Sequence, residues 1–347
     1  MSASRQELME KWLGQLAATP LDLSSIQPAS SDASFRRYFR VKSRAGDSTF
    51  VVMDAPPDKE NVLPFIEVAG VLAQAGVKAP AILAKSVEQG FLLLDDFGSR
   101  TFLSVLGGGG EEADEKAHAM YRCALSDLVH MQANADTQTL PAYSPEKLRS
   151  EMDLFDEWFV KAHCKMELTA QEQQWLDNIK ALCIESALSE AQVFVHRDYH
   201  SRNLMLPQGV QPELDFGVID FQDAVKGPMT YDLVSILRDA YIEWPEDETL
   251  DWAIRFWEQA RKQGLPVPDD ASVFYKQVDL MGLQRHIKIL GIFARLNYRD
   301  GKSQYLDDLH QVLAYVRVAA GRYSATKPLI YILDRLEGRS IEVGYTF

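Results

Sequence analysis

Apolar residues recur at helical spacing at the start of the chain, which predicts an amphipathic helix over residues 5–18. Runs of β-branched and aromatic residues follow and predict strands, separated by one helix over residues 61–74. The predicted strands are 38–41, 49–53, 81–83 and 91–94. The first 95 residues are therefore expected to form mostly strands.

From residue 101 the pattern changes to long helical segments, interrupted by one strand-rich segment, 193–221. The predicted helices are 112–133, 146–162, 169–188, 230–243, 247–263, 270–297 and 302–321. At roughly 150 residues per domain, 347 residues suggest two domains or lobes. We predict an α+β fold with a small β-rich lobe, residues 1–95, and a larger, mostly helical lobe, residues 96–347.

The overall charge narrows the classes of partner. Thirty-six basic and 50 acidic residues give a net charge of −14, which argues against nucleic acid, since phosphate contacts need a basic footprint. Three cysteines without CxxC spacing indicate reduced thiols. The sequence shows neither a secretion signal nor an apolar run of membrane-spanning length. We expect a cytoplasmic protein, monomeric, with small-molecule partners and no contact with a membrane.

The segment 193–206 is typical of a strand that enters a polar loop and a second strand that leaves it. Asp198 lies in the loop, Asn203 follows five residues later, and Asp220 ends another apolar strand seventeen residues after Asn203. Pairing of the two short strands as a hairpin would bring these oxygen-bearing side chains together. Magnesium prefers such hard ligands, and phosphoryl transfer also needs a carboxylate to accept the hydroxyl proton.

The spacing matches the protein-kinase signature H-R-D-x-x-x-x-N followed by D-F, here His196-Arg197-Asp198, Asn203 and Asp220-Phe221. Gln222 replaces the glycine of a D-F-G motif. The segments 219–224, 227–228 and 231–233 instead resemble the aminoglycoside phosphotransferase and choline kinase family. That resemblance, over about residues 31–295, implies a protein-kinase-like two-lobed fold, ATP and Mg²⁺ as cofactors, and a small-molecule hydroxyl as acceptor.

Three further segments, 31–40, 52–57 and 284–296, are similar to those of bacterial anomeric sugar kinases within that family. Such kinases phosphorylate the C1 hydroxyl of N-acetylmuramate and N-acetylglucosamine in cell-wall recycling. The resemblance therefore implies an amino sugar as the acceptor. Which of the two sugars is preferred, and whether ATP is preferred to GTP, do not follow from the sequence.

The resemblance also implies roles for single residues. Asp198 would be the catalytic base, and Asn203 and Asp220 would hold magnesium. His196 would orient the catalytic loop, and Asp232 would accept hydrogen bonds from backbone N–H groups of that loop. Taken alone, Asp232 is equally typical of an acidic residue at a helix N-terminus.

For the nucleotide, the resemblance places the hinge at Asp95, Asp96 and Phe97 and the phosphate-covering loop at Ser31 and Ser34. Related kinases carry a cation on the third strand, but Met53 and Asp54 occupy that position here. Glu67 fits the acidic partner of that cation. Arg36 or Arg37 would supply the missing charge, because arginine suits bidentate phosphate contacts. Alternatively, magnesium neutralises most of the phosphate charge.

The acceptor should lie beside Asp198. The residues expected to contact it are His200, Arg202, Gln222, Arg238, Asp239 and Arg285. Choline would need an aromatic cage, for which Tyr241, Trp244 and Phe274 are available. Kinases of another small alcohol, such as choline or an aminoglycoside, and a nucleotide-binding pseudokinase therefore stay open as alternatives.

Overall fold

A computed structural model gives the structure of the chain. It describes residues 4–31, 35–107, 109–110, 113–207 and 215–339. The chain divides into two compact units, and each is described by itself. The N-terminal unit comprises Met1–Val105 with Arg202–Asp223, and the C-terminal unit comprises Leu106–Ser201 with Ala224–Phe347. None of the helices in these described ranges is both long enough and apolar enough to cross a membrane.

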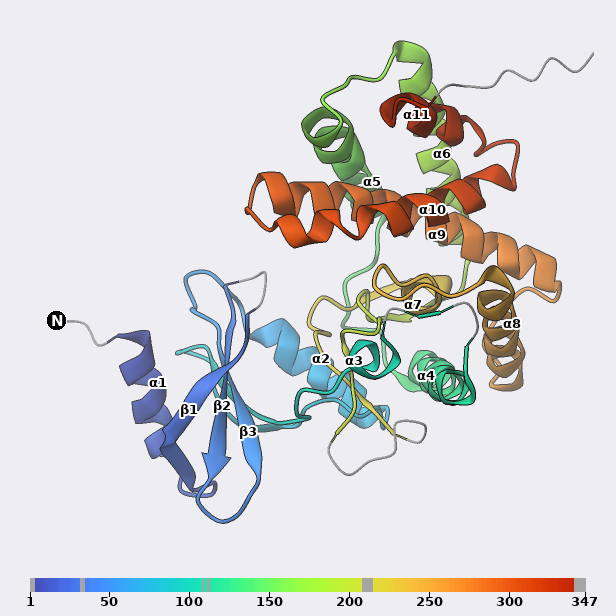
Figure 1. Cartoon of the computed structure of the whole chain (residues 1–347). Coiled ribbons are helices and arrows are strands. Elements are labelled where there is room, and N and C mark those ends of the chain that lie inside the picture. Colours follow the sequence, from blue (N-terminus) through green and yellow to red (C-terminus); the bar gives the residue numbers. More distant parts are fainter. Residues whose placement is uncertain (1–3, 32–34, 108, 111–112, 208–214, 340–347) are drawn as a thin grey trace, which may run out of the picture. The chain divides into compact units, whose positions relative to one another are not determined.

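The N-terminal unit is built on a five-stranded antiparallel sheet of order β1-β2-β3-β5-β4 (Figure 1). Its strands are β1 (Leu21–Ser31), β2 (Arg37–Ser43), β3 (Thr49–Asp54), β4 (Ile82–Ser86) and β5 (Phe91–Asp95). Side-chain alternation gives the sheet two faces. Helix α1 (Arg5–Gly14) packs on one face, where Trp12 stacks on Phe91 with ring centroids 5.6 Å apart. Helix α2 (Leu63–Gln74) places Phe65 on the side of the alternate residues, such as Leu94.

A short hairpin from later in the sequence completes the N-terminal unit, together with helix α3 (Phe102–Leu106). Strand β7 (Leu204–Met205) pairs antiparallel with β8 (Gly217–Val218), so the predicted hairpin is present. The amide of Val218 donates to Lys78 O at 2.8 Å. A Cβ on Gly217 would lie 2.2 Å from the Phe97 ring, so this position requires glycine.

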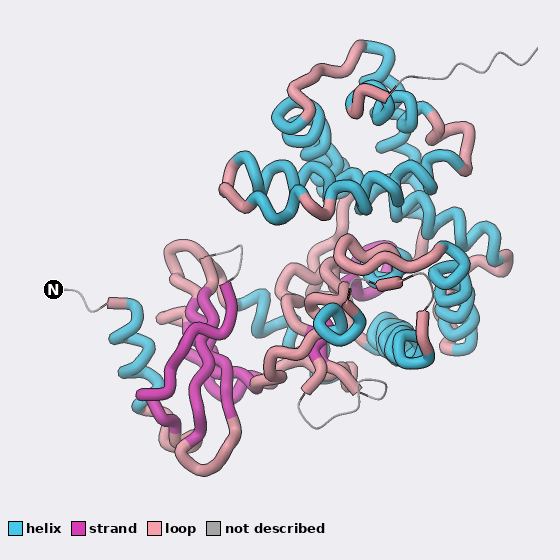
Figure 2. Tube along the Cα trace, viewed as in Figure 1, coloured by secondary structure: helices cyan, strands magenta, loops and turns pink. Residues whose placement is uncertain are grey.

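The C-terminal unit is mostly helical, as predicted (Figure 2). Two short strands, β6 (Gln192–Val195) and β9 (Val225–Pro228), pair antiparallel within it. Its helices are α4 (Glu115–Asn134), α5 (Pro145–Leu154), the π-helix η1 (Phe155–His163), α6 (Ala170–Ser189), α7 (Thr230–Leu237), α8 (Glu246–Lys262), α9 (Ala271–Tyr298), the 3₁₀-helix η2 (Ser303–Leu306), α10 (Leu309–Gly321) and α11 (Pro328–Leu336).

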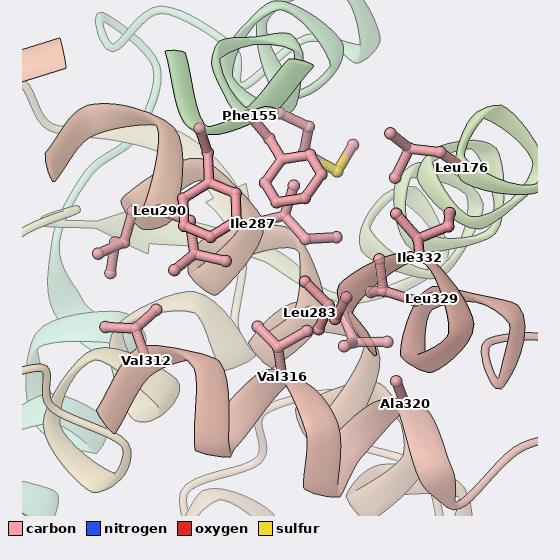
Figure 3. Packing of buried hydrophobic residues seen from close by; sticks show 14 of the residues in the cluster. Phe155, Leu176, Leu283, Ile287, Leu290, Val312, Val316, Ala320, Leu329 and Ile332 are labelled. Atoms are coloured by element: carbon pink, nitrogen blue, oxygen red, sulfur yellow. The ribbon is translucent and has the colours of Figure 1, made fainter. Parts of the chain in front are cut away.

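Helix α9 is central to this unit and packs against α5, α6, α7, α10 and η1. Its residues Leu283, Ile287 and Leu290 lie in one buried apolar cluster with side chains from η1 and α11, such as Phe155 and Ile332 (Figure 3). This cluster fixes α9. The polar residues of α9 that face α7 and the loop 196–201 are thereby fixed as well.

The helix predicted over 146–162 has a change of pitch. It is α-helical to Leu154 and continues as a π-helix, where the amide of Cys164 donates to Phe159 O at 2.9 Å. The change occurs beside Gly291 of α9, whose added Cβ would lie 2.4 Å from the carbonyl carbon of Leu154. Only glycine allows this close approach of two helix backbones.

Candidate active site

Asn203 and Asp220 lie at the same end of the β7–β8 hairpin. The amide of Ile219 donates to Asn203 O at 3.1 Å, which sets the two residues on neighbouring chains. Asp220 has a φ of 66°, a left-handed conformation that is uncommon for residues with a side chain. Gln222 Nε2 donates to Asp220 Oδ1 at 2.9 Å and orients the carboxylate. The hairpin end thus holds the Asp220 carboxylate, on a backbone in an uncommon conformation, beside Asn203 on the neighbouring chain.

This hairpin end borders a cavity of about 490 Å³ within the N-terminal unit. Its volume lies in the range of small-molecule sites. The apolar part of its lining includes Val51, Phe65, Leu94, Met205, Ile219 and Phe221. The polar part includes Arg40, Asp95, Asp96, Arg202, Asn203 and Asp220. The cavity therefore combines an apolar surface suited to a flat ring with charged groups suited to a polar tail.

The residues predicted as the hinge, Asp95, Asp96 and Phe97, all line this cavity. The Asp96 carboxylate accepts from Arg40 Nε at 2.5 Å and from Thr49 Oγ1 at 2.6 Å. Although burial alone would raise the pKa of Asp96, these partners hold it below its usual range. The Asp96 side chain is therefore engaged within the protein. A ring in the cavity would meet the hinge backbone and apolar side chains.

The predicted phosphate-side residues are placed differently. Arg36 Nε lies 3.3 Å from Glu60 Oε2, and Arg37 Nη2 donates to Asp54 Oδ2 at 2.5 Å. Glu67 lies on the exposed face of α2. The Ser31 side chain and all of Ser34 lie outside the described residues. Of the arginines near the start of β2, it is Arg40 that lines the cavity.

The donor set at the hairpin end fits a magnesium ion. Asn203 and Asp220 offer an amide oxygen and a carboxylate, which are hard oxygen ligands, and Mg²⁺ commonly takes its remaining ligands from phosphates and water. Among the described residues, no three His, Cys, Asp or Glu side chains gather as a metal site. Within the part of the chain that the structure describes, an ion held by Asn203 and Asp220 would therefore take its remaining ligands from outside the protein.

The predicted catalytic loop, residues 196–201, belongs to the C-terminal unit, and side chains of that unit hold it through its backbone. Asp232 accepts from the amide of His196 at 2.6 Å and from that of Arg197 at 2.9 Å. Burial raises the pKa of Asp232 to about 7, against the lowering effect of these two N–H groups. Arg285 Nη1 donates to Arg197 O at 2.8 Å. The start of the loop is thus fixed from α7 and α9.

Asp198 lies in this loop, and its amide donates to His196 Nδ1 at 3.3 Å. Burial would raise the pKa of the Asp198 carboxyl, but nearby positive groups hold it below its usual range. These groups are His200, Arg285, Lys288 and Arg197. The carboxylate is ionised at neutral pH, as a proton acceptor must be.

A buried ionic network lies beside the loop. Glu151 Oε1 accepts from Arg197 Nη2 at 2.5 Å, and its Oε2 lies 3.1 Å from Lys288 Nζ. Lys288 Nζ donates to Tyr231 OH at 2.9 Å, and Arg285 Nη1 lies 3.3 Å from the same hydroxyl. These contacts join three largely buried cations to the single carboxylate of Glu151, and the more exposed Lys147 Nζ lies 3.8 Å from Glu151 Oε1. The surplus positive charge of the network stabilises negative charge on the catalytic loop.

Sequence reasoning missed two of these residues, Arg40 and Glu151. Alternation along β2 puts Arg40 on the same face as Tyr38, and both line the cavity. Glu151 lies in the apolar stripe of its helix, three residues after Leu148 and next to Met152. A charged residue within a buried stripe needs a partner, and that position was the available signal.

Three of the predicted acceptor contacts lie in the loop 196–201 or beside the hairpin residues in sequence. Arg202 and Gln222 belong to the N-terminal unit, where Arg202 lines the cavity. His200 belongs to the C-terminal unit and packs edge-on against Tyr241, with ring centroids 5.5 Å apart. These side chains lie close in sequence to Asp198 or Asp220, but the structure does not assign them a ligand.

The other three predicted acceptor contacts have partners inside the C-terminal unit. Arg238 Nη2 donates to the buried Asp279 at 2.7 Å. Asp239 accepts from the amide of Ser201, and Arg285 donates to the loop backbone. The partner residues lie far away in the sequence, so a single sequence shows only that the three residues are polar.

Comparison with protein families gives the class of this molecule. A model described as a phosphotransferase enzyme family matches residues 25–270, which is more than half of the chain. The chain belongs to the phosphotransferase enzyme family, and the family resemblance predicted from the sequence is confirmed.

Individual relatives are similar along most of the chain. The N-acetylmuramate/N-acetylglucosamine kinase of Neisseria meningitidis serogroup B is 44% identical over 346 residues, covering 99% of each chain. The kinase of the same name from Pseudomonas aeruginosa is 46% identical and covers 86% of this chain and 85% of its own. A solved structure of an ethanolamine kinase from Plasmodium vivax is similar at a TM-score of 0.60 and 12% identity, covering 84% of this chain and 82% of its own. That structure supports the protein-kinase-like fold.

Proposed function

We propose that this chain is a sugar kinase that uses ATP and magnesium to phosphorylate the anomeric C1 hydroxyl of N-acetylmuramate and N-acetylglucosamine. The observation that carries the proposal is 44% identity along 99% of the chain to a kinase named for both sugars. The loop and hairpin geometry supports it, because a family member needs an ionised base and oxygen ligands for a metal. The requirement for ATP and these sugars fits a cytoplasmic role in cell-wall recycling.

In the proposed reaction, Asp198 accepts the proton of the C1 hydroxyl as the sugar oxygen attacks the γ-phosphorus of ATP. The new bond joins O1 to phosphorus, the bond to the β-phosphate oxygen breaks, and the products are the sugar α-1-phosphate and ADP. Burial opposes ionisation of Asp198, but the positive groups beside the loop outweigh it, hold the pKa of the carboxyl below its usual range and keep it ionised for this role. His196 and Asp232 hold the loop, and neither takes the proton.

The nucleotide would occupy the cavity of the N-terminal unit, with its base against the hinge. Asn203 and Asp220 would hold magnesium, which supplies charge neutralisation on the phosphates when bound. Arg36 and Arg37 would add positive charge on the phosphate side, although each has an acidic partner. Unchanged KM for ATP and unchanged kcat in both Arg36→Ala and Arg37→Ala would exclude these two roles.

An ADP-release screen tests the function. The acceptors are N-acetylmuramate, N-acetylglucosamine, choline and kanamycin, so that each alternative substrate class has its own reaction. Phosphorus NMR of the product then distinguishes an anomeric phosphate from a 6-phosphate. We expect turnover of the two sugars and an anomeric product.

Two variants complete the test. Asp198→Asn should lower kcat at least about 100-fold, the usual contribution of a general base. Asp269→Asn, at a fully exposed carboxylate, is the matched control and should keep full activity. Full activity in Asp198→Asn would reject the base. Absence of turnover with every acceptor in the wild type would reject the kinase function and favour a nucleotide-binding pseudokinase.

A further inference from the structure

Asp239 has a buried carboxylate that accepts hydrogen bonds from backbone N–H groups and pairs with no cation among the described residues. Its side chain is 2% exposed. Oδ2 accepts from the amide of Ser201 at 2.9 Å, and Oδ1 accepts from the amide of Tyr241 at 3.0 Å. Among the described residues no Lys or Arg pairs with it, because the adjacent Arg238 pairs with Asp279. Burying a carboxylate is costly, and charge-assisted bonds to N–H groups offset that cost.

The residue that Asp239 holds has a particular place in the chain. Ser201 is the last residue of the C-terminal unit before the chain enters the N-terminal unit. Asp198, the proposed base, lies three residues before it, and Asn203, a proposed metal ligand, lies two residues after it. Fixing Ser201 therefore fixes the short stretch that joins the base to the metal ligand.

Asp239 is itself rigidly placed. Its backbone oxygen accepts from Gln311 Nε2 of α10 at 2.9 Å. The preceding carbonyl, of Arg238, is 3.0 Å from His286 Nε2 of α9. The carboxylate thus projects from a segment that two long helices hold in place. It resembles Asp232 at the other end of the loop, which also accepts from two backbone N–H groups.

We propose that Asp239 is a positioning residue, which fixes the C-terminal end of the catalytic loop through Ser201 and thereby sets the orientation of Asp198. The proposal rests on the proposed kinase function and deepens it. It differs from the sugar contact that the sequence led us to expect for Asp239. A misplacement of about 1 Å in a catalytic group is enough to cost 100-fold in rate.

The kinetic test compares Asp239→Ala with Asp239→Asn. We expect Asp239→Ala to lower kcat tenfold to a hundredfold, with the KM for sugar and for ATP changed less than threefold. Asp239→Asn is isosteric and keeps one acceptor oxygen, so it should recover part of kcat and serves if the alanine variant fails to fold. Glu172→Gln, at a buried acid paired with Arg335, is the matched control and should keep kcat.

Amide hydrogen exchange tests the contact without any substrate. The Ser201 amide should exchange at least tenfold faster in Asp239→Ala than in the wild type. In the control variant Glu172→Gln, the Ser201 amide and its neighbours should exchange at the wild-type rate. A tenfold rise in sugar KM at unchanged kcat would overturn the proposal in favour of a substrate contact. Unchanged kcat or unchanged exchange at Ser201 would also overturn it. Failure of the wild type to phosphorylate either sugar would instead refute the proposed function, and the exchange result would still decide whether Asp239 fixes the loop.

Discussion

The carboxyl group of Glu190 is buried against the N-terminus of helix α7. Its protonation should control the free energy of unfolding. Glu190 is 6% exposed, and its Oε2 accepts from Thr230 N at 3.0 Å and from Thr230 Oγ1 at 2.7 Å. Burial raises the pKa of Glu190 from 4.5 to about 8, although both bonds from Thr230 lower it. The folded protein therefore holds a proton at neutral pH that the unfolded chain releases.

The sign and size of the effect follow from linkage. The stabilising contribution of this proton is fully present below pH 4.5 and is lost as the pH rises toward about 8. The slope is about 1.4 kcal/mol per pH unit. Glu190→Gln keeps an acceptor oxygen for Thr230 and removes the titration. Relative to this variant, the wild type should lose about 4 kcal/mol of unfolding free energy between pH 5 and pH 8.

Urea unfolding followed by tryptophan fluorescence measures this difference. Five of the six tryptophans lie in the C-terminal unit, so the signal reports mainly on the unit that contains Glu190. Groups that titrate equally in both proteins, such as Asp232, cancel in the comparison. Glu185→Gln, at an exposed position of α6, makes the same charge change and should run parallel to the wild type. Parallel pH curves for the wild type and Glu190→Gln would refute the reasoning.

Two further experiments test the packing and the ionic network. Gly291→Ala should destabilise the fold by about 3 kcal/mol, because the new methyl group meets the Leu154 backbone, whereas Gly70→Ala, in an open position of α2, should stabilise by about 0.5–1 kcal/mol. Thermal unfolding of the two glycine variants measures these effects. Equal shifts in their unfolding temperatures would contradict the close approach of Gly291 to the Leu154 backbone. Lys288→Met and Glu151→Gln should each lower the free energy of unfolding by about 3 kcal/mol. In a double-mutant cycle, the double variant should lose at least about 1 kcal/mol less than the sum of the two single losses. Additivity would show that the pair does not interact.

Periodicity predicted most elements because most segments agree with their local preference. The helix predicted over 270–297 is observed as Ala271–Tyr298, and the strand over 49–53 as Thr49–Asp54. Strand β1 was missed. It contains Pro28 and several serines and aspartate, which disfavour strands, and its pairing with β2 has irregular register. The helix predicted from residue 302 begins at Leu309, after a short 3₁₀ turn.

The motif proposed to carry the chemistry could be predicted from the sequence because its residues lie close together along the chain. Asp198, Asn203 and Asp220 occur within one loop and one hairpin, where spacing alone suggests an arrangement. The side-chain partners of Arg238 and Arg285 come from residues at least 37 positions away. A polar residue on a predicted helix gives no sign of whether it meets a ligand or another helix. Such assignments need the tertiary structure.

The π-helix has a consequence for changes in chain length. A residue deleted from α5 would rotate every later side chain of that helix by about 100°, and would turn either Glu151 from its ionic partners or Phe155 from the apolar cluster. A residue deleted within 155–163 could be absorbed as the wider turns relax to α-helical pitch. Related chains that differ by one residue here can therefore keep both halves of the helix in phase with their surroundings.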